Sequence, residues 1–208
     1  MKYDVIIIGA GPSGIFCAYE LLKEKPDLKV LMIEKGRSIE SRQCPKRKTK
    51  KCVNCKPCSI TTGFAGAGAF SDGKFNLGTA YGGTLGEELG DDRANFYINE
   101  VDKVLNEYCT SGVPEIYRSN TALALKCLQH NLRLLDMNVK HLGTDNNFLT
   151  MRNLINALAD MGVEMRSNCE CTGISGGEDE YVIHTAGGDE LTAKDVIIAT
   201  GRGGAAFV

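Results

Sequence analysis

Residues 4–14 read DVIIIGAGPSG, and this stretch decides the fold that we expect. Its apolar part belongs to a short β-branched run, residues 3–8, which predicts a strand. Three glycines follow at the spacing Gly9-x-Gly11-x-x-Gly14, and apolar side chains then recur at helical spacing. A strand, a tight glycine turn and a helix in this order place a helix amino terminus against the phosphates of a dinucleotide. The stretch therefore predicts a dinucleotide-binding turn.

The second predicted strand ends in a carboxylate. Residues 28–35 read LKVLMIEK, an apolar run that suits a parallel strand buried on both faces. Glu34 lies 20 residues after Gly14, the distance at which a carboxylate binds the ribose hydroxyls of a dinucleotide. Arg37 is close enough in sequence to add a phosphate contact. The opening is therefore a βαβ unit for FAD or NAD, and the spacing does not choose between the two cofactors.

The remainder of the chain predicts one α/β domain with an insertion. We expect residues 1–85 to form the first part of the domain, residues 86–148 an inserted helical subdomain, and residues 149–208 the return to the domain. The returning part predicts a helix from Thr150, a strand, a hairpin and a separate final strand at residues 195–199. We expect no helix after that strand, and therefore a truncated chain. The expected fold class is a doubly wound, Rossmann-like α/β domain of the FAD/NAD(P)-binding type.

A second glycine-rich loop, residues 63–74, reads GFAGAGAFSDGK. Its small residues allow backbone amides to approach an anionic oxygen of a cofactor. We therefore expect cofactor contacts from Gly66, Gly68, Ser71 and Asp72.

Two side chains are candidates for chemistry at that cofactor. Lys74 can stabilise negative charge on a reduced flavin, although a crossover loop with a surface lysine explains the same sequence. The chain has three histidines, and His141, close to Asp145, is the best candidate for a general base. A purely structural role is the competing interpretation of this histidine.

Residues 42–58 form a Cys-rich loop in which Lys and Arg side chains, Arg42 among them, create a local positive field without any acidic residue. Cys44, Cys52, Cys55 and Cys58 permit three interpretations. They are ligands of zinc or of an iron–sulfur cluster, a dithiol that exchanges electrons with a flavin, or thiols without a specific role. The spacing favours ligation and leaves all three open.

Composition narrows the class of protein. A hydrophobic content of 43% over 208 residues excludes a disordered chain, and nine cysteines without a signal sequence favour reduced, cytoplasmic thiols. The KRKTKK run lacks interleaved aromatic residues, so we do not expect a nucleic-acid partner. No apolar run is long enough to cross a membrane. We therefore expect a cytoplasmic protein that acts on a small-molecule substrate.

Three segments, DVIIIGAGPSGIFCAYEL, VLMIEKG and VIIATGR, resemble FAD-dependent oxidoreductases of the type with two dinucleotide-binding domains. The segments CPKRKTKKCVNCKPCSITTGFAGAGAFSDGKFNL and HLGTDN are more closely similar to a bacterial group of largely uncharacterised FAD-dependent dehydrogenases. The resemblance spans nearly the whole chain and only the amino-terminal half of such proteins. It implies a flavoprotein dehydrogenase or reductase, with NAD(P)H as a candidate donor and a redox protein as a candidate partner. The alternatives are a truncated, inactive nucleotide-binding fragment and a module that passes electrons from flavin to an iron–sulfur cluster.

The resemblance also implies which residues hold FAD. The ADP part would be held by Gly9, Gly11, Pro12, Ser13, Gly14, Glu34, Lys35 and Arg37. Cys171 would meet the adenine through its backbone, and Thr200 and Gly201 would lie near the pyrophosphate or the adenosine.

Overall fold

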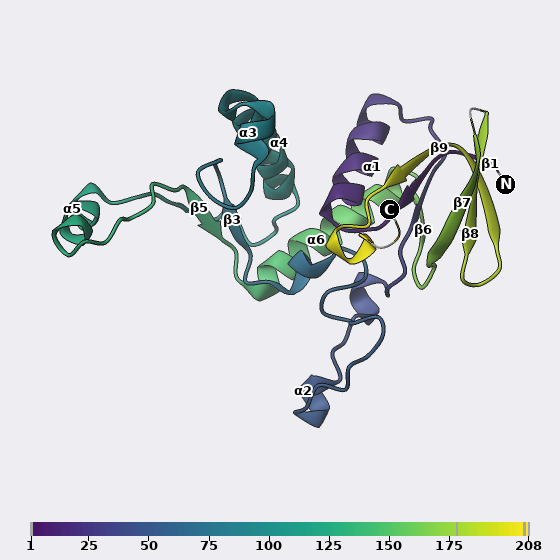
Figure 1. The fold of residues 1–208 in the computed structure, drawn as a ribbon, viewed down its shortest axis with the longest axis horizontal. Helices are drawn as coiled ribbons and strands as arrows, with labels where there is room; N and C mark the ends of the chain where they lie inside the picture. The colour runs from purple at the N-terminus through teal and green to yellow at the C-terminus, as the bar shows by residue number, and fades with distance from the viewer. Residues whose placement is uncertain (1, 178, 206, 208) are drawn as a thin grey trace. The chain divides into compact units, whose positions relative to one another are not determined.

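The computed structural model describes residues 2–177, 179–205 and 207, and these fall into two compact units (Figure 1). The first unit comprises Met1–Ala69 and Arg152–Val208, and the second comprises Phe70–Met151. The second unit begins earlier than the insertion expected at residue 86, because a strand that precedes that position pairs with a strand that follows it.

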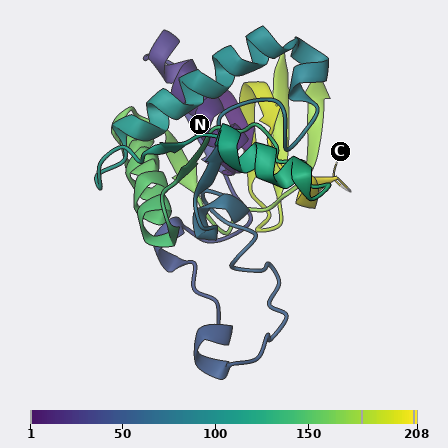
Figure 2. The same cartoon turned by 90° about the vertical axis from the view of Figure 1, so that its left-hand side faces the viewer.

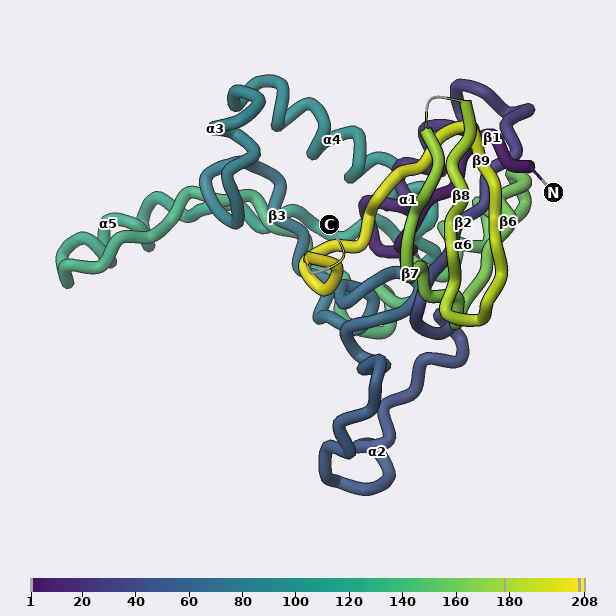
Figure 3. The backbone as a smooth tube through the Cα atoms, turned by 45° about the vertical axis from the view of Figure 1, so that its right-hand side comes forward, coloured from purple at the N-terminus to yellow at the C-terminus, as the bar shows by residue number. Residues whose placement is uncertain are grey.

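A six-stranded sheet forms the centre of the first unit. Its strands are β1 (Lys2–Ile8), β2 (Val30–Ile33), β6 (Glu164–Arg166), β7 (Cys171–Gly177), β8 (Glu180–Thr185) and β9 (Glu190–Ile198), in the order β6-β2-β1-β9-β8-β7. β1 pairs in parallel with β2 and β9, and β2 pairs in parallel with β6. From β9 the sheet continues with β8 and then β7, which are joined by antiparallel pairings and which Figure 3 shows side by side. The predicted parallel α/β sheet is confirmed.

The glycine turn connects β1 to helix α1 (Pro12–Glu24), which packs on β1 and β2. Ile6 and Ile7 of β1, Ile15 of α1 and Leu31 of β2 are all fully buried. A continuous apolar run is what a parallel strand covered on both faces requires. The predicted βαβ opening is therefore confirmed, both in its strands and helix and in the apolar residues that they bury.

Two predictions for the returning part are wrong in detail. The sequence predicts a hairpin followed by a separate final strand. In the structure, the second strand of the hairpin and the final strand are one strand, β9, which pairs with β8 on one side and with β1 on the other. Ala193 pairs with Tyr181 of β8 in the antiparallel direction, and Ile197 pairs with Ile7 of β1 in the parallel direction. Helix α6 (Thr144–Asp160) begins six residues before the predicted start at Thr150, and Asp145 lies in its first turn.

The second unit contains a small sheet as well as helices. Strands β3 (Lys74–Asn76), β5 (Val139–His141) and β4 (Ile116–Tyr117) pair in that order, and all of their pairings are antiparallel. Its helices are α3 (Leu85–Leu89), α4 (Asp91–Glu107), α5 (Thr121–Gln129) and the first part of α6. Strands of two or three residues are too short to give a period-two pattern, so the sequence predicts only the helices.

The Cys-rich loop leaves the body of the first unit after the 3-10 turn η1 (Ile39–Ser41) and carries the short helix α2 (Lys46–Thr49). Figure 2 shows this segment extending away from the helices and strands. Further 3-10 turns are η2 (Ala67–Phe70) and η3 (Arg202–Gly204). Within the part of the chain that the structure describes, no helix has the length and apolar character needed to cross a membrane.

Candidate cofactor site

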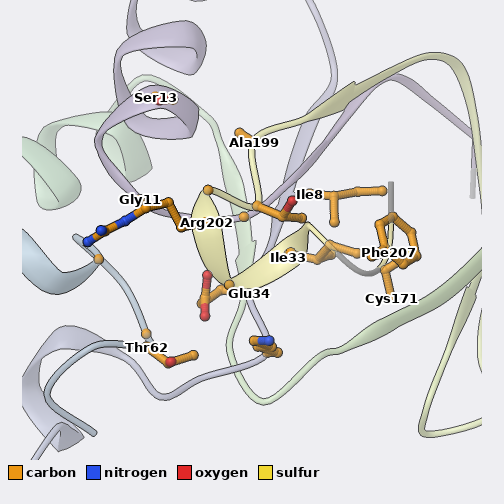
Figure 4. A pocket seen from close by; sticks show the side chains of 18 of the residues that line it. Ile8, Gly11, Ser13, Ile33, Glu34, Thr62, Cys171, Ala199, Arg202 and Phe207 are labelled. Atoms are coloured by element: carbon orange, nitrogen blue, oxygen red, sulfur yellow. The ribbon is translucent and has the colours of Figure 1, made fainter. Parts of the chain in front are cut away.

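A pocket of about 600 Å³ lies in the first unit, where β1, β2 and β9 end and β7 begins (Figure 4). Ligands of open α/β sheets bind in the crevice at the carboxyl ends of the parallel strands. The pocket lining brings together ten of the predicted cofactor residues: Gly9, Gly11, Pro12, Ser13, Glu34, Lys35, Gly66, Cys171, Thr200 and Gly201.

The three glycines of the turn have different physical roles. Gly9 has φ 108°, and a Cβ there would overlap the carbonyl oxygen of Ala199. A Cβ at Gly14 would overlap the carbonyl oxygen of Gly9 beneath the turn, so Gly14 supports the turn without lining the pocket. Gly11 has the ordinary φ of −76°, and a Cβ there would meet no protein atom within 4 Å. The space beside Gly11 is therefore open toward the pocket.

Helix α1 presents its amino terminus at this open space. Gly11 is its N-cap and provides no side-chain hydrogen bond, and Pro12 occupies the first turn. The unpaired N–H groups of a first helical turn and the positive end of the helix dipole both favour an anion. The open cradle beside Gly11 and the uncapped helix start thus fit a pyrophosphate.

Glu34 is the acid of the pocket and is also part of its framework. Its side chain is buried, and its carboxylate accepts hydrogen bonds from the backbone amides of Ala10, at 3.0 Å, and Gly36, at 2.8 Å. A carboxylate offers about four lone-pair positions, so two amides leave acceptor capacity for ribose hydroxyls. Figure 4 shows the two oxygens pointing into the space between Gly11 and Thr62.

A second wall of the pocket comes from residues 61–66. Thr61, Thr62, Gly63 and Gly66 line it, and the amide of Ala65 donates to the carbonyl of Ala10 at 2.8 Å. This hydrogen bond ties the second glycine loop to the first. The residues of the second glycine loop that line the pocket are therefore its first ones.

Arg42, one of the residues that give the Cys-rich loop its positive field, does not lie on the surface. It is 3% exposed, and its guanidinium donates to backbone carbonyls of the second wall. Burial lowers the pKa of Arg42 to about 10, so the group stays charged at neutral pH. Carbonyl oxygens replace water around this charge, so Arg42 contributes to the second wall of the pocket and not to an exposed basic surface.

The start of β7 closes the pocket on the adenine side of the predicted site. Cys171 and Cys169 both line it, and burial raises the pKa of each thiol. Neither sulfur is therefore a thiolate at neutral pH, and a backbone contact is the role that suits Cys171.

Several lining residues were not predicted from the sequence. They are Ile8, Ile33, Thr61, Thr62, Gly63, Ala67, Cys169, Glu170, Ala199, Arg202, Gly203, Gly204 and Phe207. Ile8, Ile33 and Ala199 could have been found, because they end parallel strands or directly follow one. The position of the others depends on loops whose course the sequence pattern does not reveal.

Other predicted residues lie outside the lining. Arg37 has an exposed side chain, and its carbonyl accepts a hydrogen bond from the Phe64 amide at 3.0 Å. Gly68 lies in the turn η2 and does not line the pocket. Ser71 and Asp72 belong to the second unit.

The two predicted catalytic side chains are neighbours in the second unit. Lys74 of β3 is the register partner of His141 of β5. The ammonium of Lys74 lies 2.8 Å from the carboxylate of Asp72, and this hydrogen bond lowers the pKa of Asp72 and raises that of Lys74. All three side chains are exposed. The small sheet thus assembles a charged cluster from residues far apart in sequence.

The four cysteines of the Cys-rich loop are all free thiols. Among the described residues, no three His, Cys, Asp or Glu side chains converge as ligands of a metal ion. Ligation by Cys44, Cys52, Cys55 and Cys58 stays a prediction from spacing.

Two family models match parts of the chain. The model described as Thi4 family matches residues 1–41, and the model described as flavin containing amine oxidoreductase matches residues 110–208. The thiamine thiazole synthase of Coprinopsis cinerea is 52% identical over 33 residues, which are 16% of this chain and 10% of that protein. An uncharacterised protein of Methanosarcina barkeri is 45% identical over 53 residues, or 26% of this chain and 13% of that protein. These local matches span about a tenth of the curated relatives.

Solved structures match nearly the whole chain. Glycine oxidase from Geobacillus kaustophilus superposes with a TM-score of 0.57 at 17% identity, over 96% of this chain and 55% of that chain. NikD, an unusual amino acid oxidase essential for nikkomycin biosynthesis, gives a TM-score of 0.55 at 15% identity, over 96% of this chain and 51% of that chain. The chain spans about half the length of these oxidases. The likeness shows that the chain has their Rossmann-like α/β fold.

Proposed function

We propose that this chain forms the FAD-binding part of an FAD-dependent oxidoreductase that acts on a small molecule. One observation carries the proposal: the open cradle at Gly11, the uncapped start of α1 and the Glu34 carboxylate all face one pocket. These groups match a pyrophosphate and a ribose in the order that a dinucleotide presents them. The match of residues 110–208 to the model described as flavin containing amine oxidoreductase supports the same cofactor class.

Each wall of the pocket has a proposed task. The first turn of α1 binds the pyrophosphate, Glu34 accepts from the ribose, and the backbone near Cys171 orients the adenine. FAD supplies the two-electron redox chemistry when it is bound, and the protein supplies position and charge. Following the family resemblance, NAD(P)H is the proposed donor for a reductase and a redox protein a proposed partner.

We propose Lys74 and His141 as catalytic groups that do not take part in holding FAD: Lys74 stabilises negative charge on the reduced flavin, and His141 is a general base. Their support is the cluster with Asp72, which holds the Lys74 ammonium in place by a 2.8 Å ion pair. Replacing Lys74 with Met should lower turnover while the dissociation constant for FAD stays unchanged. Normal turnover in Lys74→Met would contradict the catalytic role proposed for Lys74.

The proposal is tested by Gly11→Val, with Gly177→Val in strand β7 as the control. Both positions have free space for a Cβ and a φ outside the left-handed region, so neither variant should strain the backbone. The valine at position 11 would occupy the space that a pyrophosphate needs. We expect the FAD dissociation constant, followed by quenching of flavin fluorescence, to rise at least about tenfold only in Gly11→Val. Equal affinities in the two variants would contradict the proposed site.

Spectroscopy separates the two alternatives from this function. An inactive nucleotide-binding fragment, which cannot hold or use flavin, would show neither flavin bands nor cluster absorption. A module that passes electrons to an iron–sulfur cluster would show, besides the flavin bands, broad visible absorption that bleaches with dithionite, together with bound iron.

A further inference from the structure

Arg42 is a buried cation that donates four hydrogen bonds to one short segment of backbone. Its Nε donates to the carbonyl of Ser59 at 3.0 Å, and one terminal nitrogen, Nη2, donates to that of Ile60 at 2.7 Å. The other, Nη1, donates to the carbonyls of Phe64, at 2.6 Å, and Gly66, at 2.7 Å. One planar group thus fixes four carbonyls between residues 59 and 66.

The segment held by Arg42 is the second wall of the cofactor pocket. Thr61, Thr62, Gly63 and Gly66 lie within it and line the pocket. The wall wraps closely around the Arg42 side chain, because a Cβ at Gly63 would lie 2.7 Å from its Cδ. The curvature of this wall therefore depends on the guanidinium at its centre.

The same guanidinium closes the base of the Cys-rich loop. The loop leaves the body of the first unit after Arg42 and returns at Ser59, and the Nε hydrogen bond joins these two points. The hydrogen bond from the amide of Ala65 to the carbonyl of Ala10 then connects the wall to the glycine turn. Arg42 thus lies between the Cys-rich loop on one side and the cofactor pocket on the other.

We propose that Arg42 is a positioning residue, which shapes the second wall of the pocket for the cofactor and keeps the Cys-rich loop from distorting it. The role of the pocket in FAD binding rests on the proposed function. The shape of the wall does not, so the two parts can be tested separately.

Lysine cannot replace this arginine in the proposed role. Its ammonium is a point charge on a flexible stem with three donors, whereas the guanidinium presents its donors in a rigid plane. An ammonium at this site would leave at least one of the four carbonyls without its partner. Arg42→Lys should therefore loosen the second wall while it preserves the charge.

The test compares Arg42→Lys with Arg47→Lys, which changes an exposed arginine of α2 in the same loop. Hydrogen exchange of the FAD-free proteins reports the wall directly. We expect the amides of residues 59–66 to exchange at least about tenfold faster in Arg42→Lys only, while β1 and β2 remain protected. The FAD dissociation constant should rise about tenfold or more, and the absorption bands of the bound flavin should shift toward those of free flavin.

Unchanged exchange and unchanged FAD affinity in Arg42→Lys, relative to Arg47→Lys, would overturn the positioning role. If the wild-type protein binds no FAD, the proposed function fails, and the exchange of residues 59–66 still decides whether Arg42 holds the wall. If Arg42→Lys does not fold, Arg42→Gln, which keeps planar donors without a buried charge, is compared with Arg47→Gln by the same two measurements.

Discussion

The carboxylate of Glu34 accepts a hydrogen bond from the backbone amide of Ala10 at 3.0 Å, so the end of β2 holds the glycine turn that follows β1. The second carboxylate oxygen accepts from the amide of Gly36 at 2.8 Å. An acid usually discussed as a ligand for ribose is therefore also a structural acceptor for two backbone groups. The fold of the glycine turn and the proposed cofactor binding therefore depend on the same side chain.

We expect Glu34→Gln to destabilise the first unit. A glutamine amide accepts through only one of its two terminal atoms, so one of the two backbone N–H groups loses its acceptor. A buried donor without a partner costs about 1–3 kcal/mol. The free energy of unfolding, from urea titration followed by circular dichroism, should fall by that amount. Glu20→Gln, at an exposed residue of α1, should change it by less than about 0.5 kcal/mol, and equal midpoints for both variants would contradict the structural role.

Gly14→Ala and Gly11→Ala should differ in their effect on stability. A Cβ at Gly14 would overlap the Gly9 carbonyl oxygen, which belongs to the backbone and cannot turn aside. Forcing an atom into such a packed position costs about 1–3 kcal/mol or more. A Cβ at Gly11 meets no protein atom within 4 Å, and we expect a loss below about 1 kcal/mol from the poorer N-cap. Thermal unfolding of the two FAD-free variants measures this difference in stability. A lower unfolding temperature for Gly11→Ala than for Gly14→Ala would contradict the prediction.

The sequence predicts the glycine turn, the βαβ opening and the pocket residues that belong to these two features, because they depend on local pattern. Gly9, Gly11 and Gly14 are recognisable from spacing, and Ile6 and Ile7 from an apolar run. Parallel strands then bring their carboxyl ends to one edge of the sheet, which places Thr200, shortly after β9, at the pocket. Cys171 begins the antiparallel strand β7, so only the family resemblance indicates its place.

Arg42 marks where this reasoning fails. It stands beside a run of basic residues, and charge alone assigns it to the surface. Its burial depends on four carbonyls that come together only when residues 59–66 fold back over it. The pairing of Lys74 with His141 is equally hidden, because strands of three residues leave no periodic pattern.

Lys140 should contribute strongly to the stability of the second unit. Its ammonium is almost fully buried and lies 2.6 Å from the nearer carboxylate oxygen of Asp102, with Asn106 as a further acceptor at 3.1 Å. Removing one partner of a buried ion pair leaves an uncompensated charge and costs about 3–5 kcal/mol. Lys140→Met should lower the free energy of unfolding accordingly. Lys103→Met, which breaks the exposed pair with Glu100, should cost no more than about 0.5 kcal/mol, and similar losses in both would refute a buried pair.

The predicted metal site can be decided by the double variant Cys52→Ser, Cys55→Ser. We expect protein purified without oxygen to contain zinc or iron in stoichiometric amount, and the double variant to lose it with an unchanged circular dichroism spectrum. Cys127→Ser, outside the Cys-rich loop, should retain the metal. Equal metal content in wild type and double variant, or a wild type without metal, would leave the four cysteines without a ligand role.

In metal-free protein, Cys58 should react at a lower pH than Cys17. Hydrogen bonds from the backbone amide of Ile60 and from Thr61 lower the pKa of its thiol. Burial raises the pKa of Cys17, so the thiolate of Cys17 forms only at higher pH. Because the thiolate is the nucleophile, alkylation of Cys58 by iodoacetamide should accelerate at a lower pH than alkylation of Cys17.

Mass spectrometry of the alkylated peptides across a pH series measures both profiles in one sample. Replacing Thr61 with Val removes the side-chain hydrogen bond to the sulfur, and it should move the Cys58 profile toward higher pH while the Cys17 profile stays in place. Arg42 also lowers the pKa of Cys58 through its charge. Arg42→Gln should therefore shift the Cys58 profile in the same direction, whereas Arg42→Lys, which keeps the charge, should shift it less. Identical profiles for Cys58 and Cys17 would mean that the turn after Cys58 does not stabilise a thiolate.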